Sequence, residues 1–384
     1  MRIAILFLVL SLAMGAASPA PGQPLQAWRY LQALQNLQDR IVHGDEKAYR
    51  GQARLLAHIG KVYASLPEET WKNRRDAQAL LVYVLSGGNP AVALRLLKGK
   101  KPVNLPKGAL EGAVAYAEGR NGQAWAHLKA VDDKALTIAA RAQLALVKAF
   151  LRAAAKPERA LQLLDRVRLL KPGTLLEEAA LRRALVLSGN EADVPAFMRY
   201  AKNYIRHFRP SEYMPDFLRR YAWFLVHLDF GPKPHLITRM ERDIALLEPR
   251  RQALLYAAVT REALIGGKTA LAELAGKKAL SFNPGSARFK ARLHAWIAAA
   301  RIAGPDPVSA MASLRAISPA ALDESGKRLR MAALVLGRAI IEEPVAKTPA
   351  GKPGASSNVD DLPAAVRARA AIAGITRLLK DHDQ

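Results

Sequence analysis

The amino-acid sequence predicts an all-α protein built as a solenoid of stacked helical hairpins. Apolar residues recur at helical spacing, as in Trp28, Leu31, Leu34 and Ile41, and the alternating β-branched pattern of strands is nearly absent. A short phrase also recurs along the chain, and turn-forming residues precede most of its copies. Because each repeat of a solenoid packs only against its neighbours, 384 residues fit one continuous array.

The recurring phrase is an alanine, a large apolar residue, two arbitrary residues and then leucine or tyrosine. Its six copies begin at Ala93, Ala124, Ala160, Ala196, Ala270 and Ala310. The steps between these alanines are 31, 36, 36, 74 and 40 residues, and 74 equals two steps of 37 with one copy degraded. This spacing is typical of a divergent tetratricopeptide-like repeat (an α-α superhelix), in which the phrase marks the second helix of each hairpin. An alanine- and leucine-rich helical chain without repeats also produces such matches, but the agreeing turn positions favour the repeat.

The first segment, residues 1–17, is predicted to be a cleavable signal peptide. Arg2 precedes an apolar run from Ile3 to Met14, and small residues follow that run. The run is shorter than the roughly 20 apolar residues that span a bilayer, which argues against an uncleaved anchor. We therefore expect an exported mature chain without a transmembrane segment.

Four segments are expected after the signal peptide. Residues 18–75 form an N-terminal helical hairpin, with helices over about 25–42 and 46–64, and residues 76–341 form the repeat array. Residues 342–362 are rich in Pro, Gly, Ser and Lys and form a flexible linker, whereas residues 363–384 form a C-terminal helix that caps the solenoid or binds a partner. The stretch from Phe230 to Pro234 stands where the degraded copy is expected and predicts a bend.

Several signatures of catalysis are missing. The chain has no cysteine, which removes disulfides, thiol nucleophiles and cysteine-ligated metals, and its eight histidines show no zinc-site spacing. Gly267-Lys268-Thr269 is not a phosphate-binding loop, because Glu262 stands where that loop requires another glycine. Ser286 lacks the second glycine of a nucleophile elbow. We expect a non-enzymatic protein with no catalytic residues, no cofactor and no metal site.

The chain is strongly basic, with a formal net charge of +25, or +24 once Arg2 is removed with the signal peptide. Residues 77–110, 194–211 and 274–305 contain no acidic residue. Each of these stretches includes the second helix of a repeat, so basic side chains are expected on one side of a regular solenoid. Such a stripe attracts an acidic protein, anionic lipid or the cell wall, whereas a solvated basic face without a ligand is the alternative. Nucleic acid suits the charge but not the signal peptide.

Aromatic residues are concentrated in the middle of the chain. Ten of the 24 aromatic residues lie between Phe197 and Phe230. Core packing accounts for those at helical spacing, but tyrosine beside arginine is also typical of binding hot spots. The candidate partner-binding residues are Arg199, Tyr200, Tyr204, Arg206, Arg209, Arg219 and Arg220. Charge reversal at Arg199, Arg206 and Arg209 is expected to weaken partner binding and to leave helicity intact.

Two segments carry a resemblance to a known family. In the first, the phrase LQALQNLQDR over residues 31–40 leads into residues 42–45 and 55–59, and in the second, KPGTLLEEAALRR over residues 171–183 precedes residues 197–200 and 204–208. Together with the signal peptide and the length, these segments resemble the MotC family of periplasmic motility proteins from rhizobia and related alphaproteobacteria. The resemblance covers most of the mature chain, and its motifs are helical phrases rather than catalytic signatures.

The resemblance implies a periplasmic protein that binds the periplasmic domain of the flagellar stator protein MotB and is needed for flagellar rotation. Peptidoglycan is a second candidate partner, and nucleic acid is not expected. The alternative is a generic tetratricopeptide-like periplasmic scaffold for cell-envelope assembly. Flagellar genes beside this one would favour the first function, and wall-synthesis genes would favour the second.

Overall fold

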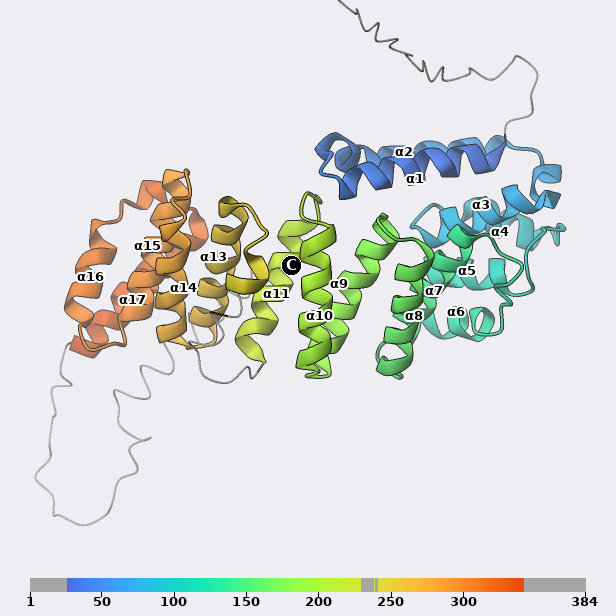
Figure 1. Cartoon of the computed structure of the whole chain (residues 1–384). Helices are drawn as coiled ribbons and strands as arrows, with labels where there is room; N and C mark the ends of the chain where they lie inside the picture. Colours follow the sequence, from blue (N-terminus) through green and yellow to red (C-terminus); the bar gives the residue numbers. More distant parts are fainter. Residues whose placement is uncertain (1–25, 229–237, 239–240, 342–384) are drawn as a thin grey trace, which may run out of the picture.

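The computed structural model of the chain describes residues 26–228, 238 and 241–341. Over these residues the regular elements are all helices, and consecutive helices pair as hairpins (Figure 1). The structure therefore confirms the predicted all-α solenoid of helical hairpins. The predicted signal peptide, linker and C-terminal helix lie outside the described residues, as does the stretch from Phe230 to Pro234.

The helices alternate between two layers of the array. Up to the middle of the chain they are α1 (Ala27–Val42), α2 (Glu46–Ser65), α3 (Arg74–Leu85), α4 (Ala91–Lys98), α5 (Ala109–Ala117), α6 (Asn121–Leu128), α7 (Ile138–Arg152) and α8 (Pro157–Leu170). The remaining ones are α9 (Leu175–Asn190), α10 (Val194–His207), α11 (Met214–His227), α13 (Pro249–Ile265), α14 (Thr269–Ser281), α15 (Ala287–Arg301), α16 (Pro307–Ala316) and α17 (Glu324–Ile341). Short 3₁₀ turns at Glu68–Lys72 and Pro319–Ala321 connect neighbouring repeats.

Local sequence explains where many of these helices begin. The side chains of Asp45, Asp193 and Asp306 accept hydrogen bonds from the backbone N–H three residues later, at 2.9, 3.0 and 2.9 Å. These caps satisfy one of the free N–H groups in the first turn of α2, α10 and α16. Proline occupies the first turn of α8, α10, α11, α13 and α16, where its missing N–H costs no helical hydrogen bond.

The recurring phrase lies on α4, α6, α8, α10, α14 and α16, which are the second helices of their hairpins. Its alanine is the third or fourth residue of the helix and is at most 3% exposed at Ala93, Ala124, Ala160, Ala196 and Ala310. The assignment at Ala270 is wrong, because Ala270 is exposed and Leu274 is 44% exposed. Ala272, the fourth residue of α14, is fully buried and is the equivalent position. With Ala272 in place of Ala270, the step from Ala196 is 76 residues, or two repeats of 38, and the step to Ala310 is 38 residues.

The N-terminal part of the array closes on itself. α1 packs on α3 and reaches α9, and α3 packs on both α5 and α7 (Figure 1). The Gln143 side chain of α7 donates a hydrogen bond to the Leu85 carbonyl at 2.9 Å, and the Thr137 N–H donates to the Gln78 side chain at 2.7 Å. First helices that are distant in the sequence therefore contact one another and cover each other's surface.

From α9 onward the first helices follow one another without such closure. α11 packs on α9 and α13, and α15 packs on α13 and α17. α10, α14 and α16 form the second layer and pack on the same first helices. Apart from α1, which contacts α9, no described helix outside this succession packs extensively on the side of α9, α11, α13 and α15 that faces away from the second layer.

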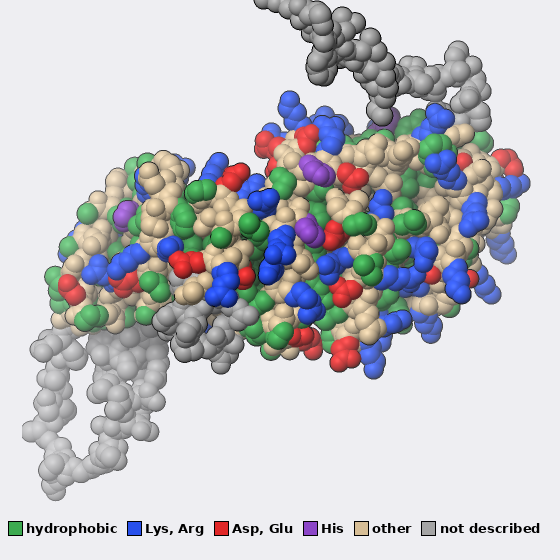
Figure 2. Space-filling view, in the orientation of Figure 1, with side chains coloured by type: hydrophobic (Ala, Val, Ile, Leu, Met, Phe, Trp, Pro, Cys, Tyr) green, Lys and Arg blue, Asp and Glu red, His purple; other side chains and the backbone are tan. Residues whose placement is uncertain are grey.

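The basic residues are distributed widely over the molecule. On the face shown in Figure 2, lysine and arginine side chains are spread along the whole array, and acidic side chains lie among them. Many pairs are local, such as Arg50 with Glu46 and Lys277 with Glu273. The stripe expected from the acid-free stretches does not appear as one continuous band on this face.

A small residue allows two neighbouring first helices to approach closely. A Cβ atom at Gly189 of α9 would lie 2.4 Å from ring atoms of Phe224 in α11, which no real contact permits. Gly122 of α6, by contrast, is exposed and has no other atom within 4 Å of such a Cβ. Gly189 is therefore required by packing, whereas Gly122 is not.

We predict that Gly189→Ala lowers the urea midpoint of unfolding. Overpacking a core position costs about 1–3 kcal/mol, and this exceeds the gain of about 0.5–1 kcal/mol that alanine brings in a helix. The matched variant Gly122→Ala is expected to leave the midpoint unchanged or to raise it. Equal midpoints for the two variants would show that the α9–α11 contact is looser than the structure describes.

Candidate partner-binding groove

The uncovered side of the first helices, which we call the first-helix face, carries three hollows. The α9 hollow, about 490 Å³, lies between α7, α9 and α11. The α13 hollow, about 470 Å³, lies between α11, α13, α15 and the residues at the start of α17. The α15 hollow, about 490 Å³, lies between the starts of α13 and α15. Leu254, Phe289 and Arg292 line both of the last two, which therefore form one groove.

The charged residues of these hollows are mostly of one type. Eight arginines and two acidic residues line them, and lysine is absent from the lining. The arginines are Arg182, Arg183, Arg219, Arg220, Arg250, Arg261, Arg288 and Arg292. Glu262 and Asp323 are the acidic residues. The first-helix face is therefore positively charged along α9, α11, α13 and α15.

Arg292 is fixed between two aromatic rings in the groove. Its guanidinium carbon lies 5.3 Å from the ring centres of both Phe289 and Trp296, and its Nη1 is 3.6 Å from a carboxylate oxygen of Asp323. Cation–π contacts of this kind hold the guanidinium plane in place. The arrangement leaves a preformed site in which an arginine and two aromatic rings stand together.

Asp216 is surrounded by three of the arginines. Its carboxylate contacts Arg220 at 2.9 Å, Arg219 at 3.0 Å and Arg182 at 3.7 Å. Partial burial alone raises the pKa of Asp216, but the hydrogen bond and charge of Arg220, with the charges of Arg182 and Arg219, outweigh it and lower the pKa. The carboxylate is therefore ionised at neutral pH and neutralises one positive charge of three.

Arg183 also lines the α9 hollow and remains exposed to solvent. Its guanidinium carbon is 5.1 Å from the centre of the Phe150 ring. Burial lowers the pKa of Arg183, Tyr116 opposes that shift, and the charge of Arg182 adds to it. The hollow thus holds two adjacent arginines beside a partly exposed aromatic ring.

A buried carboxyl group behind the α9 hollow joins α9 to the α10–α11 connection. Glu178 is fully buried, and its Oε1 accepts hydrogen bonds from the Tyr204 hydroxyl at 2.5 Å and the Ser211 hydroxyl at 2.6 Å. Burial raises the pKa of Glu178, although these two hydrogen bonds oppose the shift. This network fixes α9, which carries Arg182 and Arg183, against the segment that leads into α11.

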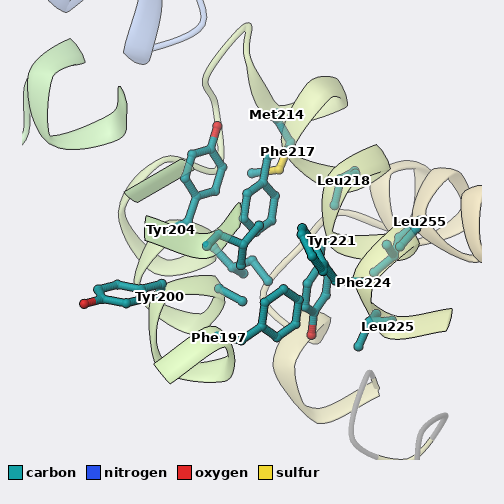
Figure 3. Close-up of a cluster of buried hydrophobic side chains, with 14 of the residues drawn as sticks. Phe197, Tyr200, Tyr204, Met214, Phe217, Leu218, Tyr221, Phe224, Leu225 and Leu255 are labelled. Atoms are coloured by element: carbon teal, nitrogen blue, oxygen red, sulfur yellow. The ribbon is translucent and has the colours of Figure 1, made fainter. Parts of the chain in front are cut away.

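Tyr200 and Tyr204, two of the candidate binding residues, are core residues. Their exposed fractions are 1% and 0%, and Figure 3 shows Tyr204 beside Phe217 within the buried cluster. The Tyr204 and Phe217 rings are stacked at a centre distance of 3.9 Å, and the Tyr200 hydroxyl donates to Asp165 at 3.1 Å. Core packing, which the sequence left open as the alternative, therefore accounts for both rings. The helical spacing of Tyr200 and Tyr204 with Phe197 and Phe208, which are also buried, indicated this packing in the sequence.

The five candidate arginines do not share one surface. Arg199 and Arg206 are exposed on α10 in the second layer, and Arg209 follows that helix and donates a hydrogen bond to the Leu246 carbonyl at 3.2 Å. Arg219 and Arg220 lie on α11 and line the first-helix face. Because α10 and α11 pack through their aromatic sides, their exposed sides point in opposite directions.

Six arginines of the first-helix face are absent from the binding residues that the sequence suggested. They are Arg182, Arg183, Arg250, Arg261, Arg288 and Arg292. Arg288 and Arg292 lie in the acid-free stretch 274–305, which was expected to be basic but not to bind the partner, and the other four lie outside these stretches. One sequence feature does point to this face. α9, α11 and α15 each carry arginine in the middle of the helix, on a side that the second helix of the hairpin does not bury.

The described part of the chain contains neither a metal-binding cluster nor a membrane-spanning helix. No three histidine or acidic side chains in it are close enough together to hold a metal ion. None of its helices combines the length and the apolar character of a membrane-spanning segment.

Comparison with known proteins identifies similar sequences. The family described as "Chemotaxis protein MotC" matches residues 1–382 of the chain. A protein named "Chemotaxis protein MotC" from Rhizobium meliloti (strain 1021) is 28% identical over 344 residues, which cover 89% of this chain and 78% of that protein. No solved structure matches the chain significantly.

We predict that Glu178→Gln stabilises the protein at neutral pH and that this gain shrinks as the pH falls. The folded-state pKa of Glu178 lies above its ordinary value of 4.5, so the native state binds the proton more tightly than the unfolded state does. The charged form therefore costs stability above the folded-state pKa, and the cost disappears as the pH falls toward 4.5.

Urea midpoints of the wild type and the variant at several values between pH 7 and about pH 4.5 measure this gain. The pKa values of Asp39 and Asp76 are also raised by burial, but both groups are present in both proteins and cancel in the difference. A difference that does not change with pH would contradict the assignment.

Proposed function

Because the chain belongs to the MotC family of chemotaxis proteins, we propose that it is a non-enzymatic periplasmic protein that binds the periplasmic domain of the stator protein MotB and is required for flagellar rotation. The observation that carries this proposal is the extent of the family match, which spans residues 1–382 and so includes the array with its first-helix face. Export rests on the predicted signal peptide over residues 1–17, and the absence of cysteine suits an oxidising compartment.

The geometry supports recognition of a protein partner. A stacked array of helical hairpins provides an extended, fixed surface, and such surfaces are typical binding sites of solenoid proteins. The first-helix face adds a positive potential, which accelerates encounter with an acidic partner and selects against a basic one. Arg219 and Arg220, two of the residues that the sequence nominated, lie on this face.

The second candidate function is a scaffold for envelope assembly that binds peptidoglycan or an enzyme acting on it. The net charge of +25 favours it, because peptidoglycan carries carboxylates and the cell wall is anionic. The first function requires saturable binding to MotB, whereas the second requires binding to peptidoglycan or to an enzyme that acts on it.

We predict saturable binding of the mature chain, residues 18–384, to the purified periplasmic domain of MotB from the same bacterium in titration calorimetry. The affinity is expected to fall as salt is raised from about 0.05 to 0.3 M, because screening shortens the range of the positive field. Co-sedimentation with purified peptidoglycan is the matched control. Co-sedimentation with peptidoglycan, together with no heat of binding to MotB at either salt concentration, would replace the stator function by the scaffold function.

A further inference from the structure

We propose that the first-helix face from α7 to the start of α17 receives an acidic, amphipathic segment of the partner protein. Its carboxylates meet the arginines of the face, and its apolar side chains enter the α9 hollow and the groove formed by the α13 and α15 hollows. This inference rests on the proposed function, since it states which chemistry the partner presents to this chain.

The choice of arginine over lysine points to carboxylates on a protein. The basic residues that line the three hollows are arginines, although lysines are frequent elsewhere in the chain. A guanidinium binds a carboxylate through two parallel hydrogen bonds and also stacks on aromatic rings, and it loses less hydration than an ammonium group does. Arg292 already lies beside both kinds of group, because its Nη1 is 3.6 Å from an oxygen of Asp323 and its guanidinium carbon is 5.3 Å from the ring centres of Phe289 and Trp296.

The hollows also offer apolar surface beside these charges. Phe150 in the α9 hollow is 44% exposed, and Leu254 in the shared groove is 38% exposed. Val186 lines the first and Phe289 lines the second, and both are partly exposed. Aromatic and arginine side chains around a depression are the composition of interface hot spots. A segment with acidic residues alone would leave this apolar surface in water.

The occupant is restricted to the second half of the array by the fold. In the N-terminal part, α1 packs on α3 and contacts α9, and α3 packs on α5 and α7, so the first-helix surface before the α9 hollow is largely covered. From α9 onward the corresponding surface is hollowed and lined by charge. The open face is therefore a strip across α9, α11, α13 and α15.

Charge argues against other occupants. The chain's own residues 363–384 contain four basic residues and two acidic ones, Asp381 and Asp383, so the net positive charge of this segment disfavours an arginine-lined face. A second copy of the chain carries the same net charge of +25 and is repelled as a whole. A bilayer of anionic lipid is flat and cannot follow arginines into hollows, whereas a protein segment can.

The test compares two variants with the same change of charge. The groove variant carries Arg219→Glu, Arg250→Glu and Arg288→Glu on the first-helix face, and the second-layer variant carries Arg199→Glu, Lys202→Glu and Arg206→Glu on α10. All six side chains are exposed, so both variants are expected to keep the helical circular dichroism of the wild type. For the MotB periplasmic domain, we expect at least about tenfold weaker binding by the groove variant and a change below about threefold by the other. The second expectation replaces the sequence-based one that charge reversal at Arg199 and Arg206 weakens binding, because both residues lie on α10 in the second layer.

An apolar pair of variants tests the second part of the proposal. Leu254→Ser alters the groove and Leu274→Ser alters the second layer, and both side chains are partly exposed, at 38% and 44%. Loss of affinity in Leu254→Ser but not in Leu274→Ser is expected. Equal effects of the two charge variants, or a larger effect of the second-layer variant, would overturn the proposal.

A synthetic peptide separates this proposal from the proposed function. The probe is a labelled acidic amphipathic peptide of about 18 residues, or five helical turns, with glutamate and leucine at helical spacing. If the wild type binds this peptide and the groove variant does not, the face recognises acidic segments even when MotB itself fails to bind. If the wild type binds neither probe, or binds only phosphatidylglycerol vesicles, the proposal is wrong.

Discussion

The packing around α9 determines how the two parts of the array are joined. α9 contacts α1 and α7 on its N-terminal side, its hairpin partner α10, and α11 on the other side. The Glu178 network and the stacked Tyr204 and Phe217 rings fix these helices at one junction. Buried polar groups are stable only when they are hydrogen-bonded, so this network admits few alternative arrangements. This junction separates the N-terminal helices, which pack on one another, from the open first-helix face of the helices after α9.

The segment that carries the family resemblance, residues 171–183, supplies much of that junction. The Gly173 N–H donates a hydrogen bond to the Glu177 side chain at 2.7 Å, and this contact shapes the start of α9. Glu178 forms the buried network, and Arg182 and Arg183 line the α9 hollow. One short run of sequence thus combines a helix start, a buried polar anchor and a charged surface.

Sequence reasoning predicted the local structure well and the long-range structure poorly. Hairpins, their turns and the burial of alanines such as Ala160 follow from patterns within about 40 residues, which is the length of one repeat. The register of α14 was wrong because alanines two residues apart, Ala270 and Ala272, both fit the phrase. Closure of α1 on α9 depends on contacts between distant repeats, which no local pattern contains. The arginines of the first-helix face were missed for a similar reason, since only stacking brings Arg183, Arg219 and Arg292 to one surface.

The central claim is that this protein acts as a binding surface and that the surface is the first-helix face of its second half. Hydrogen–deuterium exchange of the mature chain, alone and saturated with the MotB periplasmic domain, tests this claim directly. The account predicts slower exchange in peptides that cover α9, α11, α13 and α15, with little change in α4, α6 and α8. Protection confined to the second layer, at α10, α14 and α16, or to the closed N-terminal part would contradict it.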